Sequence, residues 1–110
     1  MIGNQRLRKA FDFLNDRFFN SRIPGNTIVK FARIPDDGQC HMDDGSAVIL
    51  IDRSLQKHPD LATVVLIHEM IHADLRHAGY IGYSAEHCHD IMFYAAQHKL
   101  YLAGIYEGLL

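Results

Sequence analysis

The chain has 110 residues, of which 48% are hydrophobic, so it is long enough to bury one core and too short for an additional module. Eleven Lys and Arg residues against thirteen Asp and Glu residues give a formal net charge of −2, which argues against a dedicated nucleic-acid binder. The longest apolar run, Ala47 to Ile51, has the length of a strand rather than of a membrane span, and the amino terminus lacks the apolar core of a signal peptide. We therefore expect a single domain over residues 1–110, located in the cytoplasm and without membrane contact.

The first third of the chain predicts a helix followed by a strand. Residues 4–19 have helical periodicity, and Pro24-Gly25-Asn26 ends this segment before a predicted strand at 27–34. The expected buried stripe of the helix comprises Leu7, Phe11, Leu14 and Phe18.

Positive charge is concentrated in residues 1–35. Seven Lys and Arg residues against two Asp residues give this part 7 − 2 = +5, so the remainder carries −2 − 5 = −7. Such a basic third is able to meet an acidic partner or a DNA backbone. The more economical interpretation is that these side chains flank the buried face of a solvated helix. We therefore expect nucleic-acid binding to be weak and non-specific at most.

Two further strands and a long helix are predicted next. Pro35-Asp36-Asp37-Gly38 is typical of a turn, residues 39–42 of a short strand, Asp43-Asp44-Gly45 of a hairpin turn and residues 46–52 of a third strand. Pro59 and Asp60 then begin the long helix. The pattern predicts an α+β domain with a small antiparallel sheet.

The long helix contains the sequence His68-Glu69-Met70-Ile71-His72, which has the HExxH pattern. A step of about 100° per residue places His68 and His72 only about 40° apart on the helix surface, so both imidazoles are able to reach one metal ion. Glu69 flanks them, where a carboxylate is able to take a proton from a water molecule on that ion. Neutral imidazole suits Zn²⁺, and a catalytic zinc site has three protein ligands and an open fourth position.

The residues around this motif favour a metal site over three solvated polar side chains. Leu61, Val64, Val65, Ile71 and Leu75 fall on the side of the two histidines, while Leu66 and Met70 lie roughly opposite, so the helix is apolar nearly all round. A buried helix must satisfy its polar groups, because each unpaired group costs about 1–3 kcal/mol. One metal ion satisfies them together.

The third ligand is expected from the segment that opens the last predicted helix, at about residues 85–103. His77 lies about 140° beyond His72 and points away from the metal, and His58 and His98 are expected to be surface or helix-face residues. Three candidates remain: Glu86, His87 and His89. Helical geometry alone leaves all three open. Tyr80 and Tyr83, in the preceding loop, are candidates for stabilising an oxyanion.

The run from Phe18 to about Tyr94 resembles the SprT-like family of zinc metallopeptidases. The matching segments are Phe18-Phe19-Asn20, Gly38-Gln39-Cys40, Ile51-Asp52-Arg53-Ser54-Leu55 and the segment from Leu66 to Ala73 that contains the HExxH motif. The third histidine of that family begins a helix about fifteen residues after the second, so the resemblance favours His87 as the third ligand. This chain reads His87-Cys88-His89-Asp90-Ile91 where the family usually has His-Gly-x-x-Phe.

The resemblance implies a compact zincin-like domain whose carboxyl-terminal helix carries the third ligand. It also implies a zinc-dependent endopeptidase that cleaves protein substrates, with His68, His72 and His87 holding Zn²⁺ and Glu69 as general base. Two alternatives remain: a DNA-associated protease, supported here by the basic first third alone, and a non-catalytic zinc-stabilised binding module. Glu69 speaks against the module, because a structural zinc site needs no base.

Overall fold

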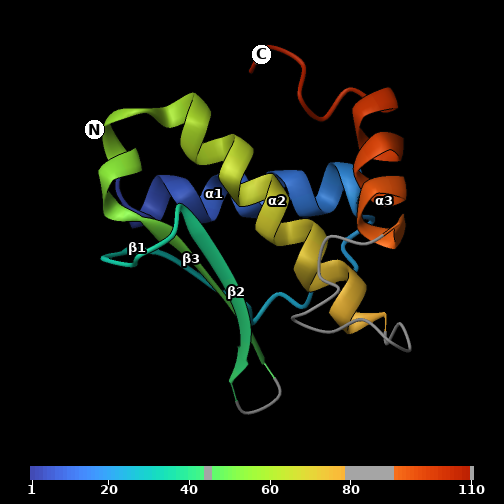
Figure 1. Cartoon of the computed structure of the whole chain (residues 1–110), viewed down its shortest axis with the longest axis horizontal. Coiled ribbons are helices and arrows are strands. Elements are labelled where there is room, and N and C mark those ends of the chain that lie inside the picture. Colours follow the sequence, from blue (N-terminus) through green and yellow to red (C-terminus); the bar gives the residue numbers. More distant parts are fainter. Residues whose placement is uncertain (44–45, 79–90, 110) are drawn as a thin grey trace.

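The computed structural model describes residues 1–43, 46–78 and 91–109. Along the chain, helix α1 (Asn4–Phe18) is followed by strands β1 (Ile28–Ala32), β2 (Gly38–Asp43) and β3 (Ser46–Asp52). A short 3-10 helix η1 (Arg53–Lys57) leads into the long helix α2 (Pro59–His77), and helix α3 (Ile91–Leu102) comes last. In Figure 1, α1 and α2 cross on one side of the sheet and α3 stands beside α2. The predicted α+β class is confirmed.

The sheet is mixed, so the prediction of an antiparallel sheet was wrong for one of its two strand pairs. The strand order is β1-β3-β2, with β2 antiparallel and β1 parallel to β3. β3 is the most apolar strand, and the central position buries its Ile49 and Ile51 completely. Strand β2 lies between β1 and β3 along the chain, so β1 and β3 are far enough apart in sequence for the long connection that a parallel pair requires.

Helix α1 begins and ends close to the predicted limits, but its last buried aromatic residue differs from the prediction. Leu7, Phe11 and Leu14 are buried as expected, whereas Phe18 is only half-buried and Phe19 takes the interior position at 1% exposure. The chain leaves the helix through Asn20 and Ser21, which both have positive φ. Beyond the end of the helix, the backbone turn and not the helical period determines that Phe19 is buried. Asn15 stabilises this exit by donating to the Ile23 carbonyl and accepting from its amide, at 2.8 and 3.2 Å.

Helix α2 packs on β2 and β3 of the sheet and also contacts α1 and α3. It begins at Pro59, as predicted, and Asp60 in its first turn complements the helix dipole. Four side chains from two successive turns fill the core on its inner side, and each of them is at most 1% exposed: Leu66, Ile67, Met70 and Ile71. Asp74, near the carboxyl end of α2, forms a bidentate ion pair with Arg22, in which Nε and Nη2 donate to the two carboxylate oxygens at 3.1 and 2.9 Å. This pair fixes α2 to the segment that follows α1.

Not every residue near the motif is as buried as predicted. Leu61, expected on the side of the histidines, is 55% exposed at the first turn of α2. His58 and His98, predicted as surface or helix-face histidines, are exposed, and so is His77, at which α2 ends. Among the helices of the described residues, none is long and apolar enough to cross a membrane.

Candidate metal centre

Two imidazoles of α2 converge at the middle of the molecule. His68 Nε2 and His72 Nε2 lie 3.2 Å apart, with the rings edge to face at a centroid separation of 4.9 Å. Two nitrogen ligands at about 2.0–2.1 Å from one zinc ion in a tetrahedral arrangement would be about 3.3–3.4 Å apart. The spacing of the two nitrogens therefore fits a shared zinc ion without rearrangement of the side chains.

Phe93 of α3 holds the two rings in this position. Its side chain is 1% exposed, and its ring centroid lies 4.8 Å from that of His68 and 4.7 Å from that of His72. Histidine that is packed by an aromatic ring loses little further rotamer freedom when it binds an ion. Phe93 was not predicted to belong to the site, because the apolar pattern of α3 does not reveal which residues its buried face contacts.

Glu69 lies beside the pair, on the side of α2 that faces β2. Glu69 is 6% exposed, and this burial raises the pKa of its carboxyl to about 7. The nearby Arg76 guanidinium opposes the increase in pKa, and the Asp36 carboxylate adds to it. A carboxyl with a pKa near neutrality is suited to accepting and returning a proton. Arg76 also connects the helix to the strand, since its Nη1 donates to the Cys40 carbonyl at 2.7 Å.

Gly38, the first residue of β2, brings the sheet edge against Glu69. A Cβ atom at this position would lie 2.6 Å from Val65 Cγ1 and 2.9 Å from Glu69 Oε2, closer than real Cβ atoms approach. Only glycine therefore allows this approach of strand to helix. Gly38 was predicted to end a turn and was matched in the family resemblance, but its steric role depends on the packing of β2 against α2.

The remaining predicted site residues lie outside the described part of the chain. These are the candidate ligands Glu86, His87 and His89, together with Tyr80 and Tyr83. Within residues 1–43, 46–78 and 91–109, no group of three or more His, Cys, Asp and Glu side chains is arranged to hold a metal ion. The third ligand therefore stays a prediction.

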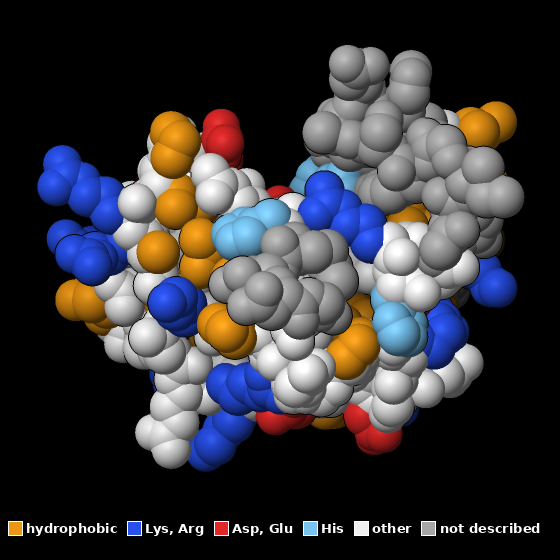
Figure 2. Space-filling model, turned by 90° about the horizontal axis from the view of Figure 1, so that it is seen from below, with side chains coloured by type: hydrophobic (Ala, Val, Ile, Leu, Met, Phe, Trp, Pro, Cys, Tyr) orange, Lys and Arg blue, Asp and Glu red, His pale blue; other side chains and the backbone are white. Residues whose placement is uncertain are grey.

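The basic character of the first third has a partly structural explanation. Arg8 donates to the backbone carbonyls of Thr27 and Gly25, and Arg22 pairs with Asp74, so both guanidinium groups stabilise the fold. Other Lys and Arg side chains gather at the left edge of the face seen in Figure 2. The same edge of the molecule in Figure 1 contains η1 and the ends of β1 and β3. Arg33, Arg53 and Lys57 line a hollow there.

Comparison of the sequence with protein-family models and with curated proteins found no match.

Proposed function

We propose that this protein is a zinc-dependent endopeptidase of the SprT-like kind, which hydrolyses peptide bonds in protein substrates. The observation that carries the proposal is the pair of imidazole nitrogens 3.2 Å apart on α2, with the buried carboxyl of Glu69 beside them. His87 completes the proposed ligand set with His68 and His72.

The chemistry divides between the metal and the chain. Bound zinc would supply Lewis acidity, which activates a water molecule and polarises the scissile carbonyl. Glu69 accepts a proton from the attacking water and donates it to the leaving amine. The elevated pKa of its carboxyl, about 7, supports both roles, because the group neither holds nor releases its proton too strongly near neutrality.

Strand β2 provides a place for the substrate backbone. It is an outer strand of the sheet, and among the described residues no other strand pairs with its free edge. An extended polypeptide adds to such an edge through backbone hydrogen bonds. Since Gly38 of β2 lies against Glu69, a peptide paired with this edge would pass close to the general base.

The buried carboxyl favours an enzyme over a non-catalytic zinc-stabilised module. Burying an ionisable group costs free energy, and a structural zinc site has no use for a base next to its ligands. A carboxyl at 6% exposure, held close to the sheet by a glycine, is therefore better explained by catalysis.

The test of the proposal compares wild type with Glu69→Gln, both loaded with zinc. Glutamine preserves the shape of the side chain and removes the base, so hydrolysis of an unfolded protein should fall by about 10²–10⁴-fold. The zinc content should stay at one per chain. The exposed Glu107→Gln variant serves as the matched control and should retain full activity. Equal turnover by wild type and Glu69→Gln would rule out Glu69 as the base.

A further inference from the structure

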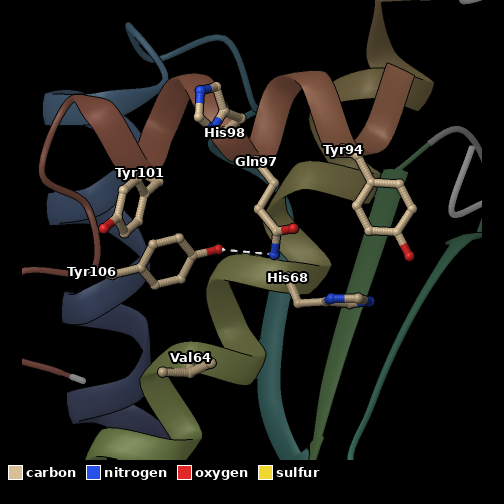
Figure 3. Close-up of a pocket in the computed structure, with 7 residues that line it drawn as sticks. All are labelled: Val64, His68, Tyr94, Gln97, His98, Tyr101 and Tyr106. Atoms are coloured by element: carbon tan, nitrogen blue, oxygen red, sulfur yellow. Dashed lines mark hydrogen bonds between the residues drawn. The ribbon is translucent and has the colours of Figure 1, made fainter. Parts of the chain in front are cut away.

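A hollow lies between α2 and α3 on the side of the histidine pair that is opposite β2. It has a volume of about 380 Å³ and is lined by Val64, His68, Tyr94, Gln97, His98, Tyr101 and Tyr106. We refer to it as the aromatic pocket. Figure 3 shows Val64 and His68 on α2, four residues on the α3 ribbon above them, and Tyr106 entering from the segment that follows α3. The volume is within the range of small-ligand sites.

The order of side chains around α2 places this pocket next to the proposed metal. At about 100° per residue, Val64, His68, His72 and Glu69 follow one another around the helix at about −40°, 0°, 40° and 100°. The two histidines therefore lie between the aromatic pocket and the general base. A peptide that pairs with β2 near Glu69 and crosses the histidines would next meet the pocket.

The walls of the pocket are largely aromatic. Tyr94 packs edge to face on Phe93, at 5.6 Å between centroids, and Phe93 itself contacts both metal-site histidines. At the other end the Tyr101 ring stacks on His98 at 6.5 Å. Gln97 Nε2 donates to Tyr106 Oη at 3.4 Å, as the dashed line in Figure 3 shows.

The charge of the lining selects among substrate side chains. Neither a carboxylate nor a Lys or Arg side chain is among the described residues of the pocket. A cationic substrate side chain would find no counter-ion in that lining and would be repelled by a zinc ion at His68, while an anionic one would find no guanidinium or ammonium partner there. An aromatic side chain fits the walls, because rings pair favourably at centroid separations of about 4.5–7 Å.

Exposed apolar residues continue the pocket along α3. Tyr94 and Tyr101 are 56% and 59% exposed, and Ile91 and Leu102 at the two ends of the helix are 80% and 70% exposed. Large exposed apolar surfaces on a soluble domain mark places where other molecules bind. An unfolded polypeptide presents apolar side chains of this kind, whereas a folded protein buries them.

We propose that the aromatic pocket binds an uncharged aromatic side chain of the substrate, Phe or Tyr, next to the scissile bond. This inference rests on the proposed peptidase function. It makes unfolded, aromatic-containing protein segments the preferred substrates, with the exposed face of α3 holding the apolar residues that follow.

The test uses quenched fluorescent peptides that differ at a single position next to the mapped cleavage site. Phe and Tyr should exceed Asp and Lys by at least about tenfold in kcat/KM, since apolar pockets discriminate by roughly 10–200-fold. Val64→Phe fills the pocket and should abolish the preference, and Tyr101→Ala, at a more exposed position, should reduce it severalfold. Phe13→Ala removes an exposed aromatic residue of α1 and should change nothing.

Binding provides a second measurement that does not require turnover. Fluorescence anisotropy of the same peptides with zinc-loaded Glu69→Gln should give the same order, and adding Val64→Phe should remove it. If the peptides bind in this order but wild type cleaves none of them, the pocket assignment holds and the peptidase proposal fails. Equal binding and cleavage of all peptides, a preference for Asp or Lys, or a preference that survives both pocket variants would overturn the inference.

Discussion

Helices α2 and α3 are both apolar on nearly all sides, yet the fold treats them differently. Nine of the nineteen residues of α2 are buried, against two of the twelve in α3, so α2 is largely enclosed, whereas the described residues cover α3 on one side only. In α2, enclosure extends to Glu69 and His72, and burial raises the pKa of Glu69. In α3 the uncovered side presents Tyr94 and Tyr101. Both helices are apolar, but α2 carries the residues proposed for catalysis and α3 carries those proposed to bind the substrate.

The largest effect on stability should separate the two helices directly. Ile67→Ala on α2 removes a side chain that is 0% exposed, and we expect a loss of about 2–5 kcal/mol in the free energy of unfolding. Leu102→Ala on α3 removes one that is 70% exposed, so its effect should stay within about 0.5 kcal/mol. Urea unfolding of the zinc-free proteins measures both. Similar losses of stability in the two variants would contradict the conclusion that Leu102 lies on an uncovered side of α3.

A smaller effect should reveal how tightly α2 is packed on β2. Gly38→Ala places a methyl group 2.6 Å from Val65 Cγ1, so we expect a cost of about 1–3 kcal/mol in the free energy of unfolding. Gly25→Ala is the matched control, because nothing lies within 4 Å of its added Cβ.

Val65→Ala combined with Gly38→Ala should recover part of that loss, since the shortened side chain makes room for the methyl group. Urea unfolding of wild type, Gly38→Ala, Val65→Ala and the double variant gives the coupling free energy between the two positions. Additive losses in the double variant would show that the contact between strand and helix is not the source of the cost.

The smallest effect concerns the segment that leads into α2. Asp52 caps η1: hydrogen bonds from the Ser54 hydroxyl, and then from the amides of Ile34 and Ser54, lower the pKa of its carboxyl. A carboxyl whose pKa is lower in the folded state contributes stability that is fully present above its unfolded pKa, about 3.9, and is lost as the pH falls through its folded pKa. Wild type should therefore lose more stability than Asp52→Ala between pH 5 and strongly acidic pH. Parallel losses in urea unfolding would exclude this role.

The sequence predicted elements better than their arrangement. The HExxH helix and the third strand begin where the pattern places them, because Pro59 and the turn residues before Ser46 act locally. The pairing of β1 with β3 depends on contacts between segments that are distant in sequence. One signal was available: the uninterrupted apolar run at Ala47–Ile51 is typical of a central strand, since it is able to bury both faces.

The candidate site was predictable to the extent that a single helix determines it. The approach of His68 to His72 follows from the spacing of four residues on one helix. The contribution of Phe93 depends on how α3 packs, and that of Gly38 on an approach of strand to helix that leaves no room for a Cβ atom. Neither has a local signature. The choice among Glu86, His87 and His89 lies outside the described residues.

Zinc analysis of purified single variants tests the central claim most directly, namely that the enclosed helix α2 holds a metal ion. Wild type should contain one zinc per chain, and His68→Ala and His72→Ala should lose it. The matched control His77→Ala, on the exposed end of the same helix, should retain it. Among the predicted third ligands, His87→Ala should lose zinc and His89→Ala should keep it. Wild type that neither contains nor takes up zinc, or zinc that persists after both His68→Ala and His72→Ala, would contradict the account.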